Sequence, residues 1–261
     1  MNFRRIQGIF LIAFVILDIA LVISFFWGFW RVQSSSGQSV SQQAVLLREM
    51  KTDSITVPKL SSHKPSGYYI SVNSSTDLSD EVTQLSRQSA YWSGTQITST
   101  FNNAIANQTA TIQSWLKSNA RIAHGQSYQV NQDFSTKSRL VYTQMIDGIP
   151  VLDSTGRIQF RVSGQKLTGY TQTYLKGIKV LRQQVTTISS QQAVSILYRH
   201  NEIPSNSKIV WLQYGYSKVD SADDQDIYAP IWEAKLRDRS NNKTSYLRVN
   251  AITGTIIQTN D

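Results

Sequence analysis

The stretch that decides how this chain is organised is GIFLIAFVILDIALVISFFWGFW, residues 8–30. It contains one charged residue, Asp18, and it is flanked by Arg4 and Arg5 on one side and by Arg31 on the other. As an α-helix, its 23 residues would extend roughly 34 Å, which exceeds the ~30 Å thickness of the hydrocarbon core of a bilayer. We therefore predict a transmembrane helix over residues 8–30.

The flanks of this segment predict its processing and its orientation. A secretory signal has an apolar region of about 7–15 residues and a small-residue cleavage site, whereas this run is longer and is followed by VQSSSGQSV, so we predict an uncleaved signal anchor. Residues 1–7 carry two arginines and no acid, which favours a cytoplasmic tail, because long domains are translocated largely regardless of charge. The expected localisation is the cell membrane, with a single span, a cytoplasmic N-terminus and an extracellular ectodomain over residues 31–261.

Asp18 is the residue of the span that most needs an explanation. An ionised carboxylate in the middle of a bilayer costs about 2.5–3.5 kcal/mol, and its neighbours at helical spacing, Phe14, Val15, Leu21 and Val22, offer no polar partner. We predict that these five residues bind another transmembrane helix. The alternative is a protonated carboxyl group that an otherwise hydrophobic span tolerates.

The ectodomain is basic and free of cysteine. Apart from Arg4, Arg5 and Asp18, all charged residues lie in residues 31–261, which therefore carry a net charge of +8. The absence of cysteine argues against a disulfide-stapled animal ectodomain and fits a bacterial surface. The positive charge would attract anionic wall polymers or lipid headgroups, but it is spread along the chain like ordinary solubility charge. No Lys/Arg tract suggests nucleic acid.

The chain beyond the membrane divides into a stalk and a first folded unit. Residues 31–43 are rich in Ser and Gln, which is typical of a flexible stalk, and we place the first unit at residues 44–180. Short helical and strand patterns are expected at residues 44–51 and 68–72, and an amphipathic helix at residues 107–123. Alternating apolar and polar residues then predict strands at residues 127–134, 138–146, 156–162 and 166–178, with a tight turn at Asp147-Gly148.

The second unit, residues 181–261, repeats this plan. Ser189 and Gln192 have the spacing of a capping box at the start of a helix that runs to about residue 201. Strand patterns follow at residues 208–219, 228–238, 244–251 and 254–259. The predicted fold class is therefore α+β: a transmembrane helix followed by two helix-plus-antiparallel-sheet units.

The sequence offers no catalytic constellation. His63, His124 and His200 stand far apart, no cysteine supplies a thiol, and neither a G-x-S-x-G nor an S-x-x-K motif is present. The acidic run at residues 220–226 lacks the glycine and the distal glutamate of an EF-type calcium loop. We predict no catalytic, metal or cofactor-binding residues and a protein that is not an enzyme; an anchored hydrolase is the weakest hypothesis.

Two tyrosines are candidates for contact with a partner protein. The strands are rich in Tyr and Trp, and alternation places about half of them in the core. Tyr170 and Tyr174 share one face with Gln172, and we predict that this face is exposed and binds a partner, because Tyr is enriched at binding hot spots.

Three segments carry a resemblance to a known family: RRIQGIFLIAFVILDIALVISFF, YTQMIDGIPVLDSTGRIQFRVSGQKLTGYTQTYLKGI, and the closing part from QAVSILYRHNEIP to YLRVNAITGTI. Together they resemble the YycI (WalI) family from end to end, and the C-terminal hairpin also looks like that of PepSY domains. The resemblance implies a YycH/PepSY-like ectodomain and a single-pass accessory regulator in a Gram-positive bacterium. Its partners would be the sensor histidine kinase YycG (WalK) and the related protein YycH (WalH).

The leading hypothesis is therefore a non-enzymatic membrane protein that modulates this kinase, which controls cell-wall metabolism, through transmembrane and ectodomain contacts. Regulation has opposite signs among relatives, so activation and inhibition both stay open, as do homo- and hetero-oligomers. The alternative hypothesis is a surface-tethered module that binds anionic cell-wall polymers.

Overall fold

The computed structural model describes residues 40–74 and 76–258, with side chains from residue 43 onward. The chain forms two compact units, residues 1–52 and 53–261. The described part of the first unit is helix α2 (Val40–Thr52), which confirms the helix expected at residues 44–51. Residues 40–43, predicted as the end of the stalk, are helical instead, because isolated helices become more favourable as they lengthen and Ser and Gln do not interrupt one.

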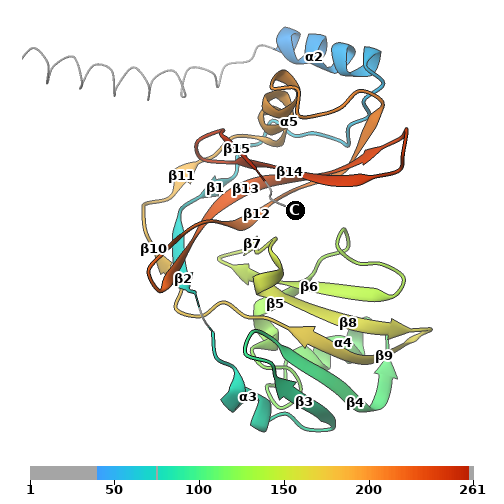
Figure 1. Cartoon of the computed structure of the whole chain (residues 1–261), viewed down its shortest axis with the longest axis vertical. Coiled ribbons are helices and arrows are strands. Elements are labelled where there is room, and N and C mark those ends of the chain that lie inside the picture. Colours follow the sequence, from blue (N-terminus) through green and yellow to red (C-terminus); the bar gives the residue numbers. More distant parts are fainter. Residues whose placement is uncertain (1–39, 75, 259–261) are drawn as a thin grey trace, which may run out of the picture. The chain divides into compact units, whose positions relative to one another are not determined.

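The second unit contains two large antiparallel sheets and a small one (Figure 1). In the seven-stranded sheet the strand order is β3-β4-β9-β8-β6-β5, with β7 paired to β6. In the six-stranded sheet the order is β10-β2-β13-β14-β15, with β12 paired to β13, and β1 pairs with β11 separately. This mixture of helices and antiparallel sheets confirms the α+β class.

The element bounds are as follows. The seven-stranded sheet consists of β3 (Gln88–Trp92), β4 (Ile97–Ala106), β5 (Tyr128–Val130), β6 (Arg139–Ile146), β7 (Ile149–Pro150), β8 (Arg157–Ser163) and β9 (Lys166–Gln172). The other strands are β1 (Ser66–Gly67), β2 (Ile70–Asn73), β10 (Lys179–Val180), β11 (Val185–Thr186), β12 (Ser207–Ala222), β13 (Gln225–Asp238), β14 (Thr244–Asn250) and β15 (Ile256–Ile257). The helices of this unit are α3 (Ser79–Thr83), α4 (Thr109–Leu116) and α5 (Ser190–Arg199), with 3₁₀ turns η1 (Gly125–Ser127) and η2 (Ser154–Gly156).

Helix α4 covers the apolar face of the seven-stranded sheet. Its buried residues Ile112 and Leu116 belong to the same core cluster as Ile158 and Phe160 of β8. The helix expected at residues 107–123 is thus confirmed over its central part. It ends early, at Leu116, where the turn-favouring residues Ser118 and Asn119 follow.

The local signals at α5 and at the β6–β7 turn are confirmed. The Ser189 hydroxyl accepts from the backbone N–H of Gln192, and the Gln192 side chain accepts from the backbone N–H of Ser189, which completes the capping box. Asp147 and Gly148 both have positive φ, 48° and 79°, as a two-residue type I′ hairpin requires.

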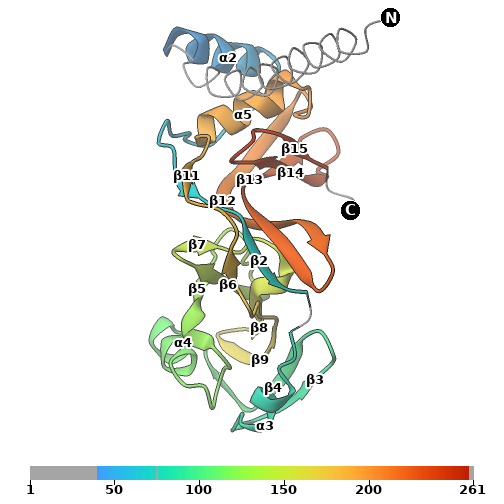
Figure 2. The same ribbon diagram turned by 90° about the vertical axis from the view of Figure 1, so that its left-hand side faces the viewer.

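Strand pairing crosses the predicted boundary between residues 180 and 181. Strand β2, from the first predicted unit, pairs with β13, and Ile70 lies opposite Tyr228. Sequential strands are neighbours only about two-thirds of the time, and a strand recruited from a distance leaves no signal in a local pattern. The chain must therefore pass between the two sheets, from β2 to α3 and later from β9 to β10; Figure 2 shows the first passage.

Among residues 40–74 and 76–258, no helix is both long enough and apolar enough to span a membrane. The predicted cytoplasmic tail, residues 1–7, the predicted transmembrane helix, residues 8–30, and most of the predicted stalk lie outside the described residues.

Candidate functional site: the crossover clamp

The two passages between the sheets lie side by side. The backbone N–H of Asn73, at the end of β2, donates to the carbonyl of Lys176, between β9 and β10, at 3.0 Å. Next to it, Gly177 has a φ of +68°, and a Cβ there would lie 2.3 Å from Oδ1 of Asn73. The positive φ favours glycine at this position, and any side chain there would also displace that of Asn73.

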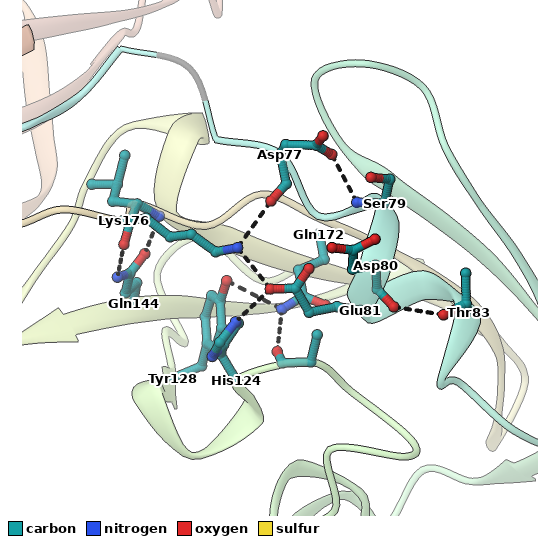
Figure 3. Close-up of polar contacts among 12 residues, drawn as sticks. Asp77, Ser79, Asp80, Glu81, Thr83, His124, Tyr128, Gln144, Gln172 and Lys176 are labelled. Atoms are coloured by element: carbon teal, nitrogen blue, oxygen red, sulfur yellow. Dashed lines mark hydrogen bonds and ion pairs between the residues drawn. The ribbon is translucent and has the colours of Figure 1, made fainter.

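An ion pair fastens the two passages to each other. Nζ of Lys176 lies 2.6 Å from Oε1 of Glu81 in α3 and donates to the carbonyl of Asp77 at 2.9 Å (Figure 3). The carboxylate of Asp77 in turn accepts from the backbone N–H of Ser79 at 2.8 Å, at the start of α3. Lys176 therefore binds both the segment that enters α3 and the helix itself.

His124 supplies Glu81 with a second partner. Its Nε2 lies 3.3 Å from Oε1 of Glu81, and its ring stacks on Tyr174 with the ring centroids 4.3 Å apart and the planes 3° from parallel. His124 itself has a φ of +52°, a left-handed conformation that is uncommon outside glycine. We call Asp77, Glu81, His124, Tyr174 and Lys176 the crossover clamp.

Two buried glutamines anchor the clamp to the seven-stranded sheet. The Gln144 side chain exchanges two hydrogen bonds with the backbone of Leu175, accepting from its N–H at 2.8 Å and donating to its carbonyl at 3.1 Å. Nε2 of Gln172 donates to the carbonyl of Ala123 at 2.6 Å, beside His124 (Figure 3). These hydrogen bonds from buried amides fix the backbone on both sides of the clamp, although Oε1 of Gln172 has no hydrogen-bond partner among the described residues.

The charge balance of the clamp favours an ionised Glu81. Burial acts to raise the pKa of this carboxyl group, but hydrogen bonds from Lys176, from the backbone of Glu81 and from His124 together outweigh it and hold the pKa below its ordinary value. Burial raises the pKa of the Tyr128 hydroxyl, which donates to the carbonyl of Thr173 at 2.5 Å. The contacts of the crossover clamp are suited to holding the two chain passages together.

A second set of polar contacts joins the two sheets at η2. The backbone N–H of Leu152 donates to the carbonyl of Tyr216 in β12 at 2.8 Å. The Asp153 carboxylate accepts from the Ser217 hydroxyl at 3.0 Å and lies 3.4 Å from Nη2 of Arg248. Nε of Arg248 donates to the almost fully buried carboxylate of Glu233 at 2.5 Å.

The structure places the predicted partner-binding residues as follows. Asp18, Phe14, Val15, Leu21 and Val22 lie outside the described residues, so the predicted contact through them stays a prediction. The expectation that Tyr170 lies on an exposed face is wrong: it is fully buried, and its hydroxyl donates to the carbonyl of Arg121 at 3.1 Å.

Tyr174 follows the end of β9 at Gln172 and packs against the same core cluster as Tyr170. Tyr174 is half-buried in the clamp against His124, and its contact with a partner stays a prediction. Sequence reasoning missed Glu81 and Lys176; the local signal near Lys176 was Gly177, a glycine close to the end of the strand predicted at residues 166–178.

Among residues 40–74 and 76–258, no group of three or more His, Cys, Asp or Glu side chains is placed to hold a metal ion.

The family model described as YycI protein matches residues 33–252. A comparison with curated protein sequences gives no significant match. An uncharacterised protein from Eubacterium rectale ATCC 33656 is similar, with 8% identity, a TM-score of 0.47, and 78% of this chain and 89% of that chain covered. The C-terminal domain of YpeB from Bacillus megaterium is also similar, with 10% identity, a TM-score of 0.34, and 85% of this chain and 99% of that chain covered.

Proposed function

Because the chain belongs to the YycI family, we propose that it is a membrane-anchored, non-enzymatic accessory regulator of the YycG (WalK) two-component system. The match of the family model over residues 33–252, which leaves few ectodomain residues outside it, is the observation that carries this proposal. The proposed partners are the sensor histidine kinase and YycH, and the proposed location is the cell membrane with residues 31–261 outside.

In the proposed mechanism the predicted transmembrane helix packs beside the kinase spans. Asp18 would hydrogen-bond to a partner helix, since within its own helix it has only apolar neighbours at contact spacing. A helix that binds one arrangement of the kinase spans better than another shifts the equilibrium between them, and a coupling of about 1–3 kcal/mol changes the output about 5–150-fold.

The ectodomain would contribute through its two sheets. The crossover clamp and the η2 contacts hold the sheets together, so a partner that binds one sheet also positions the other. This supports an ectodomain that binds as one body, and the clamp is the place where its internal geometry can be altered by substitution.

Cysteine crosslinking in native membranes tests the transmembrane part of the proposal. Single cysteines are introduced at each of residues 8–30, in a chain that has none of its own, and crosslinks to the kinase spans are measured. Crosslinks that recur with helical period on the face of Asp18 support the contact, and a flat pattern refutes it. Asp18→Leu should reduce recovery of the kinase, with Ile19→Leu as the matched control.

A further inference from the structure

The seven-stranded sheet has a second face, opposite Phe160, that is only partly covered: Val141 and Thr143 on it are buried, whereas Arg139 is exposed. Residues opposite one another in an antiparallel pair lie on the same face. The register therefore aligns Arg139 with Arg161, Val141 with Gln159, and Thr143 with Arg157 on the face away from Phe160. The next strands add Thr171 opposite Gln159, and Thr98 opposite Thr171. We call Arg139, Arg157, Gln159, Arg161 and Thr171 the arginine face.

This face is positively charged and carries no carboxylate from its strands. The seven strands of the sheet contain three arginines and Lys166, and none of them contains Asp or Glu. The acid-free stretch continues over residues 154–201, which hold seven Lys and Arg. The preceding acid, Asp153, is engaged with Ser217 and Arg248 at the junction of the sheets. From outside these strands, Asp153 and Glu233 interact electrostatically with Arg157, so an oxyanion would meet its strongest net attraction at Arg139 and Arg161.

A cleft of about 280 Å³ lies at one end of the arginine face. Its lining residues all have polar side chains: five Ser or Thr residues, three Gln residues and Arg157. The volume is at the lower end of the ~300–1,000 Å³ of small-molecule sites, which suits a small ligand or one repeat of a polymer. Hydroxyl and amide groups suit a ligand that itself carries hydroxyls, while the arginines favour a negative charge.

Arg157 has hydrogen-bonding capacity to spare. Its Nη2 donates to the carbonyl of Leu152 at 2.5 Å, and its guanidinium lies 4.4 Å from the centroid of the Phe134 ring, which holds it in place. Its Nε–H is buried without a hydrogen-bond partner among the described residues. A buried unpaired donor is costly, and an oxygen of a bound anion would remove that cost.

The remaining two arginines extend the positive charge along the sheet. Nη2 of Arg161 donates to the carbonyl of Ser99 at 2.5 Å, and Nη1 of Arg139 donates to Oε1 of Gln159 at 3.4 Å. Each guanidinium has five N–H donors, so these contacts leave donors for a ligand. We propose that the arginine face and its cleft bind a polyol phosphate, with one phosphate near Arg157 and further repeats along Arg161 and Arg139.

This inference goes beyond the regulatory function and does not depend on it. It gives the predicted binding of anionic wall polymers a location, because a glycerol phosphate polymer offers both phosphates and hydroxyls. The headgroup of phosphatidylglycerol shares that chemistry, so the test must distinguish the two sources.

The experiment uses the full chain in nanodiscs of phosphatidylcholine, which carries no net charge. A short poly(glycerol phosphate) oligomer is titrated by calorimetry, with free glycerol as the uncharged comparison. We expect saturable, salt-sensitive binding of the oligomer, and a weakening of about tenfold or more in R139Q/R161Q, since hydrogen bonds to charged groups are lost. The matched control K208Q/R237Q removes the same charge from exposed positions of β12 and β13 and should bind like the wild type.

Two further arms keep the result interpretable. Gln159→Glu serves if the double variant proves unstable. It keeps the hydrogen bond from Arg161 to the backbone and adds a carboxylate to the arginine face, so it should also weaken binding of the oligomer. A different supporting outcome is that the wild type binds phosphatidylglycerol vesicles and not the oligomer. If R139Q/R161Q then no longer binds the vesicles, the result supports the site and assigns its phosphate to a lipid headgroup. Equal weakening in both double variants, or no binding to either probe, overturns the proposal.

Discussion

Nζ of Lys176 lies 2.6 Å from Oε1 of Glu81. This ion pair joins the segment between β9 and β10, which leaves the seven-stranded sheet, to helix α3, which follows the segment that enters that sheet from β2. The same ammonium group donates to the carbonyl of Asp77. The two chain passages are thereby fixed to each other close to where the first leaves the six-stranded sheet and the second enters it. This contact is the joint whose loosening should be easiest to measure.

Replacing Lys176 with methionine should loosen both passages. Because Lys176 and Glu81 are partly exposed and water screens their attraction, we expect the free energy of unfolding to fall by only about 1 kcal/mol. Hydrogen exchange should accelerate more clearly at residues 73–78 and 173–178 than elsewhere. Lys179→Met, an exposed lysine three residues on, is the control and should leave exchange at these residues unchanged; equal acceleration in both variants would contradict the clamp.

The clamp should also give stability a defined dependence on pH. The pKa of Glu81 is lowered in the folded chain below its ordinary value of 4.5. A lowered folded-state pKa means that the ionised carboxylate stabilises the fold at pH values above 4.5, and that this contribution is lost as the pH falls through the folded-state pKa.

Chemical denaturation of Glu81→Gln and of the wild type from pH 7 to pH 3 measures this dependence. The wild type should be the more stable at pH 7, and the difference between the two should shrink below about pH 4.5. A difference that is constant over the whole range would show that ionisation of Glu81 contributes nothing.

Arg248 holds a buried carboxylate, so its loss should be far more damaging than that of Lys176. The Glu233 side chain is 2% exposed, and burial raises its pKa although Arg248 opposes the change. Arg248→Met should lower the free energy of unfolding by about 3–5 kcal/mol, because it leaves that charge without its partner. The double variant E233Q/R248M should recover part of this loss. Urea denaturation of the wild type, Arg248→Met and the double variant measures both effects. An Arg248→Met variant within about 1 kcal/mol of the wild type would contradict the role of Arg248 as partner of the buried carboxylate.

Sequence patterns predicted the local structure well where the signal lies in neighbouring residues. The capping box of Ser189 and Gln192, the Asp147-Gly148 turn and the alternating strands after Tyr128 depend on contacts a few residues apart. The pairing of β2 with β13 joins residues more than 150 positions apart, and the clamp joins Glu81 to Lys176, which are 95 positions apart. Such contacts are selected by the packing of whole sheets, which no local pattern records.

Tyr170 shows the same limit within a single strand. Alternation placed Tyr170 and Gln172 on one face correctly, but it could not tell which face meets α4. Since the side chain is fully buried, Tyr170→Ser should cost about 3–5 kcal/mol of unfolding free energy, and Tyr170→Phe, which removes only the hydrogen bond to Arg121, about 1 kcal/mol. Thermal unfolding checks this, with the half-buried Tyr174→Ser as the comparison; a stable Tyr170→Ser variant would show that the side chain is not in the core.

The central claim is that the transmembrane helix regulates the kinase by contact and does more than anchor the ectodomain. The most direct measurement replaces residues 8–30 with an unrelated bacterial transmembrane anchor of equal length and orientation, and follows phosphorylation of the response regulator in cells that produce equal amounts of both proteins. If the helix acts by contact, the replacement should change phosphorylation to the level of cells lacking the protein, or close to it. Phosphorylation identical to that of the wild type would contradict it.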